Sequence, residues 1–77
     1  RWVVQEKIYD KFAEAAMAAL NRVRIGHGSD PETMMGPVVS AKQQKRVLSY
    51  LDRGAEQGAQ LLLKGGAATV PGHEGGF

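Results

Sequence analysis

The side chains with the most chemical promise lie on one edge of a predicted helix in the second half of the chain. Four polar residues follow one another at spacings of three, four and three: Gln43, Arg46, Tyr50 and Arg53. A helix brings residues at these spacings onto one edge. An amide, a guanidinium and a phenol could there form hydrogen bonds with ribose hydroxyls or phosphate oxygens. The alternative is an ordinary solvated face, since Lys42 and Lys45 lie nearby.

The two histidines offer a weaker prospect of chemistry. His27 lies between two glycines, and His73 is followed by Glu74. Loop histidines beside a carboxylate can ligate a metal, but this pair is far from any compact ligand spacing, so we predict no metal site. Nothing in the sequence ties either histidine to a nucleophile, and the chain has no cysteine. We therefore assign no catalytic residue.

Two amphipathic helices are expected to position these groups. The first is predicted over residues 6–23, where apolar residues recur every three or four positions: Ile8, Phe12, Ala15, Ala16, Ala19, Leu20 and Val23. The second is predicted over residues 40–57. Ser40 is its N-cap, Gln43 could complete a capping box, and Gly58 is its C-terminal stop. The inward stripe of this second helix comprises Gln44, Val47, Leu48, Leu51 and Ala55.

Short strands are predicted to flank the helices, over residues 2–5 and 60–63. The order strand, helix, helix, strand indicates the α/β class, although two short strands do not make a stable sheet by themselves. Between the helices lies the connector "GSDPETMMGP", residues 28–37. Asp30 is predicted to begin one short helical turn there, and Gly36-Pro37 to stop it.

Composition limits what the chain can be. With 77 residues it forms one domain at most, and a domain of this size buries only about 60% of its unfolded surface. Ten basic and eight acidic residues are well interspersed, which argues against a nucleic-acid-binding surface. No apolar run is long enough to span a bilayer, and the N-terminus lacks the pattern of a signal peptide. Both ends look cut from something longer.

A series of short motifs follows a fixed order along the chain. The motifs are Val4-Gln5-Glu6, Ile8-Tyr9-Asp10-Lys11-Phe12, the connector from Gly26 to Pro37, Tyr50-Leu51, Glu56-Gln57-Gly58-Ala59 and Gly65-Gly66. This order closely resembles a segment of the NAD(P)-dependent aldehyde dehydrogenases. The resemblance covers nearly the whole chain, and several independent motifs in one order argue against a chance match.

The resemblance implies that residues 1–77 are part of an aldehyde dehydrogenase catalytic domain, just C-terminal to the catalytic cysteine. Such an enzyme oxidises an aldehyde to a carboxylic acid with NAD or NADP, through a covalent adduct on that cysteine. In the family, the other catalytic and nucleotide-binding motifs precede the position of Arg1 or follow that of Phe77. The segment alone is therefore expected to be inactive. The resemblance also implies a cytoplasmic homo-oligomer with an aldehyde and a nicotinamide cofactor as its ligands, and no nucleic acid or membrane.

Two residues gain a cofactor-binding role from the resemblance. Aligned on Gly36-Pro37, Gln43 matches a glutamine that reaches the cofactor in some members, and Arg46 matches a Lys/Arg position close to the nicotinamide ribose. Tyr50 and Arg53 gain none. The connector would deliver the second helix to the edge of the cofactor cleft. The open alternative is a non-enzymatic helical protein-interaction module that has reused the sequence.

Overall fold

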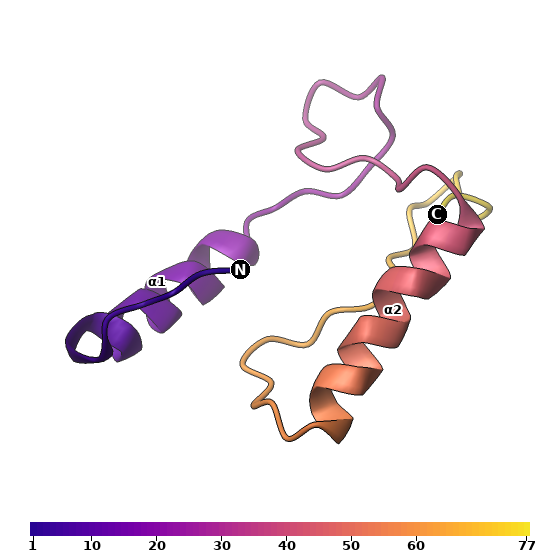
Figure 1. Cartoon of the computed structure of the whole chain (residues 1–77). Coiled ribbons are helices and arrows are strands. Elements are labelled where there is room, and N and C mark those ends of the chain that lie inside the picture. Colours follow the sequence, from indigo (N-terminus) through magenta and orange to yellow (C-terminus); the bar gives the residue numbers. More distant parts are fainter.

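The computed structural model describes all 77 residues and contains two α-helices connected by long loops (Figure 1). A short 3₁₀-helix, η1 (Glu6–Ile8), leads directly into α1 (Tyr9–Leu20), and α2 (Ala41–Glu56) follows the connector. The residues before η1 run back along α1, where the Trp2 and Phe12 rings meet edge to face with centroids 5.3 Å apart. Neither helix combines the length and the apolar composition needed to cross a membrane.

The first predicted helix is confirmed in its centre but is shorter than residues 6–23. Its first turn is the 3₁₀-helix η1, and its α-helical part ends at Leu20. Beyond that residue the Arg22 N–H donates to the Ala19 carbonyl and the Val23 N–H to the Leu20 carbonyl, both at 3.1 Å. These bonds span three residues, so the end of the helix tightens before the chain leaves it.

The second predicted helix is confirmed, with its caps. The Ser40 Oγ accepts a hydrogen bond from the Gln43 N–H at 3.2 Å, which is half of the expected capping box. At the other end Gly58 has a φ of 85°, and its N–H donates to the Ala55 carbonyl at 3.1 Å. The Ala59 N–H donates to the Gly54 carbonyl at 2.9 Å. These two bonds and the left-handed glycine form a Schellman motif, which ends the helix.

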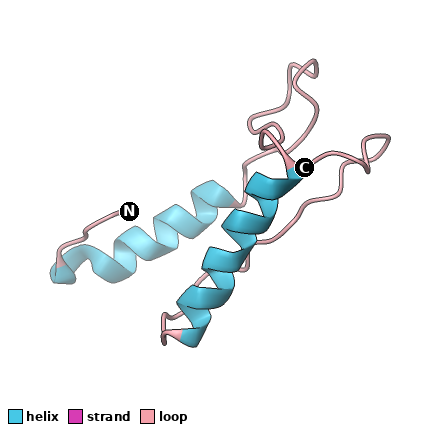
Figure 2. Cartoon of the chain, turned by 45° about the vertical axis from the view of Figure 1, so that its right-hand side comes forward, coloured by secondary structure: helices cyan, strands magenta, loops and turns pink.

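The prediction of strands over residues 2–5 and 60–63 is wrong for this chain, because both segments are loop (Figure 2). The structure therefore contains no sheet, and the α/β class is not seen in it. Gln5 has the extended backbone of a strand, with φ −62° and ψ 136°. A strand, however, requires a neighbour to bond its N–H and C=O groups, and these segments do not pair with one another.

A loop of residues 24–35, here called the closed loop, leaves the path between the helices and returns to it (Figure 1). The Arg24 carbonyl accepts the N–H groups of Met34 and Met35 at 2.8 and 3.0 Å, which closes the base. At its tip the Thr33 N–H donates to the Asp30 carbonyl at 3.0 Å. The predicted turn at Asp30 is therefore present as one β-turn, and the Asp30 side chain accepts the Glu32 N–H at 2.9 Å as a cap would.

The chain has no core, since none of its residues is buried. Its accessible surface is 6982 Å², whereas a compact protein of this mass exposes about 4,600 Å². Its radius of gyration is 14.8 Å, whereas about 11.5 Å is expected for a compact chain of this length. Large apolar side chains are consequently exposed, among them Val3 at 95% and Val39 at 90%.

Candidate functional site

Gln43 and Arg46 lie on the first two turns of α2, where the Ser40 cap begins the helix. Their hydrogen bonds involve only the backbone: the Gln43 N–H donates to Ser40, and the Arg46 carbonyl accepts from the Ser49 hydroxyl at 2.8 Å. The Gln43 side chain is half-buried and that of Arg46 is exposed. Neither side chain has an intramolecular partner, so the amide and the guanidinium are both available to a ligand.

The other half of the predicted polar edge is occupied by an internal contact. The guanidinium carbon of Arg53 lies 5.5 Å from the centre of the Tyr50 ring, within the range of a cation–π interaction. This contact holds the Arg53 charge against its own helix. The four residues predicted to act together thus divide into two pairs. The side chains of Gln43 and Arg46 are free, whereas those of Tyr50 and Arg53 contact each other.

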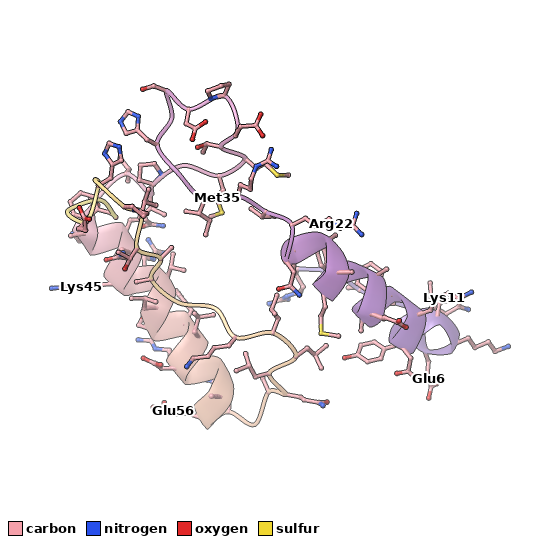
Figure 3. The ribbon with its side chains drawn as sticks, turned by 180° about the vertical axis from the view of Figure 1, so that it is seen from behind. Glu6, Lys11, Arg22, Met35, Lys45 and Glu56 are labelled. Carbon is pink, nitrogen blue, oxygen red and sulfur yellow. The ribbon has the colours of Figure 1, made fainter.

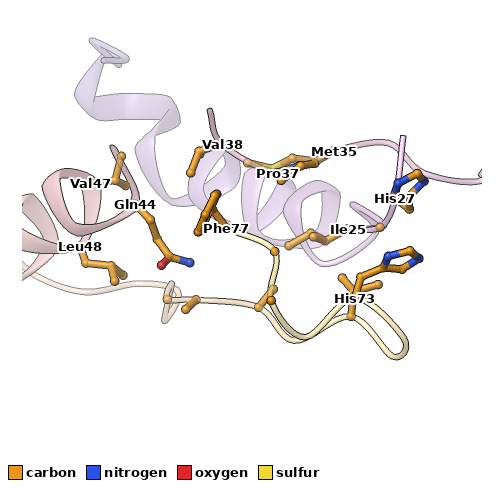
Figure 4. Close-up of a pocket in the computed structure, with 18 residues that line it drawn as sticks. Ile25, His27, Met35, Pro37, Val38, Gln44, Val47, Leu48, His73 and Phe77 are labelled. Carbon is orange, nitrogen blue, oxygen red and sulfur yellow. The ribbon is translucent and has the colours of Figure 1, made fainter. Parts of the chain in front are cut away.

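A cavity of about 440 Å³ adjoins the same helix on another side (Figure 4). It is lined by α2, by the base of the closed loop and by residues 66–77. From α2 come Gln44, Val47 and Leu48, opposite Phe77 of the tail. Gln43 and Arg46 do not line it. The sequence predicted Gln44 on the inward stripe of the helix. A polar residue within an otherwise apolar stripe is the signal that could have indicated a position lining a cavity.

A second cavity, of about 280 Å³, lies between α1 and the segment that follows α2. All of its lining residues are hydrophobic: Trp2, Val4, Tyr9, Phe12, Ala13, Ala16, Met17, Leu20, Leu62 and Leu63. Of the apolar stripe predicted for the first helix, only Phe12, Ala16 and Leu20 face this space. A space lined only by hydrophobic residues, with the Tyr9 hydroxyl as the one polar side-chain group, is a poor candidate for catalysis.

The two histidines, predicted as separate exposed loop residues, lie together. The rings of His27 and His73 are stacked, with centroids 4.5 Å apart and an angle of 18° between the planes (Figure 4). The His27 Nδ1 accepts the Ser29 N–H at 3.2 Å and lies 2.8 Å from the Ser29 hydroxyl oxygen. No group of three or more potential metal ligands occurs in the structure. The stack joins the closed loop to the tail.

The tail carries the one carboxylate with a clear shift in acidity. The Glu74 side chain accepts the Gly72 N–H at 3.0 Å. Its own backbone N–H and then that of Gly72 lower the pKa of Glu74, because both stabilise the charged form. Glu74 is thus engaged in the turn of the tail and not in a site with His73.

Comparison with known proteins identifies the family of the chain. The aldehyde dehydrogenase family model matches residues 1–77. The chain is 40% identical over 77 residues to a betaine aldehyde dehydrogenase of Mesorhizobium japonicum, covering all of the chain and 16% of that protein. It is 42% identical over 77 residues to an aldehyde dehydrogenase of Deinococcus radiodurans, covering all of the chain and 15% of that protein.

A third relative is acetaldehyde dehydrogenase 2 of Cupriavidus necator, 42% identical over 72 residues, which are 94% of the chain and 14% of that protein. No solved structure gives a significant match. The chain spans only about one seventh of the length of these relatives. Because the family model covers every residue, the chain belongs to the aldehyde dehydrogenase family.

Proposed function

We propose that the chain is a segment of the catalytic domain of an NAD(P)-dependent aldehyde dehydrogenase, which oxidises an aldehyde to a carboxylic acid. The observation that carries this proposal is the family match over residues 1–77. The absence of a core supports it, because a segment of a larger domain leaves its apolar stripes to be covered by the rest. In the longer protein, residues 2–5 and 60–63 would find neighbouring strands and give the α/β class.

Gln43 and Arg46 are the residues that would hold a nicotinamide cofactor. The free amide and guanidinium fit ribose hydroxyls and phosphate oxygens, which accept hydrogen bonds from such donors. The large cavity fits this ligand less well, because its α2 side consists of Gln44 and two aliphatic residues. Bound NAD(P) supplies the acceptor for the hydride of the aldehyde. The two side chains would orient the cofactor at the edge of its cleft.

The covalent step of this chemistry requires a thiolate. The chain has no cysteine, so the nucleophile would belong to another part of the enzyme. We further propose that the enzyme is a cytoplasmic homo-oligomer. Residues 1–77 would contribute cofactor contacts and packing to this enzyme, but no group that touches the reacting carbon.

Kinetics of the longer protein test the cofactor contacts. Gln43→Ala and Arg46→Ala should each raise the KM for NAD(P) roughly ten-fold, because each removes one donor to a charged or polar ligand. Lys42→Ala and Lys45→Ala are matched controls on the same turns, and Lys45 points away from the loops (Figure 3). Equal effects of all four changes would mean that Gln43 and Arg46 make no specific contact with the cofactor.

The rival function is a non-enzymatic helical interaction module, which the exposed apolar side chains favour. The coding sequence upstream of Arg1 discriminates between the two. A cysteine codon in a Gly-Gln-x-Cys context supports the enzyme, whereas an unrelated linker supports the module. Aldehyde-dependent reduction of NAD(P) by the longer protein would decide for the enzyme directly.

A further inference from the structure

We propose that the closed loop is a positioning element for the cofactor-binding edge, locked by the close approach of Gly26 to Thr33. This inference rests on the proposed function, since the edge in question is formed by Gln43 and Arg46. It assigns roles to residues that touch neither cofactor nor substrate. These residues would act through the direction in which α2 leaves the connector.

The lock depends on the absence of a side chain at Gly26. A Cβ atom there would overlap the Thr33 Oγ1 and lie 3.6 Å from the Thr33 Cβ. Gly26 does not have a positive φ, so the glycine is needed for space and not for an unusual backbone conformation. The Gly26 N–H donates to the Met35 carbonyl at 3.1 Å. The two sides of the loop therefore come together at this point.

The Arg24 side chain links the base of the loop to Glu32, near its tip. Its Nε donates to the Glu32 carbonyl at 2.7 Å, and a terminal nitrogen of its guanidinium lies 3.0 Å from the Glu32 carboxylate. Because the two side chains are 61% and 72% exposed, the ion pair itself stabilises the loop only weakly. The bond to the Glu32 backbone carbonyl adds a second link across the loop, beside the close approach of Gly26 to Thr33.

The base of the loop and the start of α2 line the same cavity, and residues 36–40 join them along the chain. Ile25 and Met35 border it from the loop, and Gln44 and Val47 from the helix (Figure 4). Gln43 and Arg46 immediately precede these two helical residues, so they move with them. Between loop and helix, the Val38 N–H donates to the Phe77 carbonyl at 2.9 Å and restricts the connector. Because this short connector leads directly into α2, a displaced loop base would change the direction in which α2 begins and, with it, the position of the cofactor-binding edge.

A matched pair of glycine variants in the longer protein tests this coupling. Gly26→Ala should raise the KM for NAD(P) on the order of ten-fold with a smaller change in kcat, because binding and not chemistry is disturbed. Gly28→Ala is the control, since no atom lies within 4 Å of a Cβ added there. The double variant Gly26→Ala with Thr33→Ala removes the overlapping oxygen and should restore the KM to within about two-fold.

The outcomes separate this inference from the function on which it rests. If Gln43→Ala and Arg46→Ala raise the KM but Gly26→Ala does not, the cofactor contacts hold and the positioning role is wrong. If none of the three raises it, the proposed cofactor contacts themselves fail. If Gly26→Ala lowers kcat and thermal stability without changing the KM, the close approach of Gly26 to Thr33 only stabilises the fold, and the inference is overturned.

Discussion

Glu74 illustrates how one carboxylate organises the turn in the tail. Its pKa is lowered by two backbone N–H groups, so the charged form is favoured in the folded turn. The charged carboxylate therefore stabilises the turn at pH values above the ordinary pKa of a glutamate, about 4.3. This stabilisation is lost as the pH falls through the lowered pKa of Glu74. The turn should consequently loosen only in acid.

The Gly72 amide reports this change, since it donates to Glu74 at 3.0 Å. Its NMR chemical shift should follow the titration of Glu74, with a midpoint below the ordinary pKa of a glutamate side chain. In the Glu74→Gln variant the shift should become flat over the same range. If the chemical shift of the Gly72 amide does not change with pH in the unmodified chain, this hydrogen bond does not persist in solution.

The role of individual residues was predictable only in part. Helical spacing and the resemblance predict that Gln43 and Arg46 bind the cofactor, and this stays a prediction, although neither side chain has an intramolecular partner. The stack of His27 on His73 was not predicted, because no local rule relates two loops that are distant along the chain. Contacts of this kind depend on the path of the whole connector.

The ends of α2 carry the most specific prediction for an element. Ser40→Ala should cost about 1 kcal/mol of helix stability by removing the cap, and Gly58→Ala a similar amount because its φ is 85°. Circular dichroism of the chain should show reduced helicity for both variants. The opposite sign is expected for Gly54→Ala, which replaces a helical glycine by a better helix former.

Ser49→Ala completes this set as a control for Ser40. It removes a hydroxyl that bonds within the helix, to the Arg46 carbonyl, and it inserts alanine at a helical position. Its helicity should be unchanged or higher. If Ser40→Ala behaved like Ser49→Ala, the cap would not contribute to the stability of α2.

Elements were predictable to the extent that their stabilising interactions are local. The caps and the stop of α2 lie within the helix and its adjoining residues, and they were identified correctly. The segments at residues 2–5 and 60–63 have strand-like composition but lack neighbours to bond, so they are loops here. Helices close their hydrogen bonds internally, whereas strands depend on other chain segments.

At the scale of the molecule, the large exposed surface predicts the behaviour of the isolated chain. It should show no reduction of NAD(P) at any aldehyde concentration, because it has no thiol. Its uncovered apolar stripes should bind a hydrophobic dye and favour self-association or loose packing. Sedimentation at several concentrations measures the association. A monomer that melts cooperatively and independently of concentration would contradict this expectation.

The closed loop also determines where the chain can change its length. Because the Arg24 carbonyl already binds the amides of Met34 and Met35, the ends of the loop are fixed independently of what lies at its tip. Residues inserted beside Gly28 would break the contacts between His27 and Ser29 but would leave the hydrogen bonds of Arg24 at the base of the loop in place. The tip is therefore a natural site for an inserted tag or reporter.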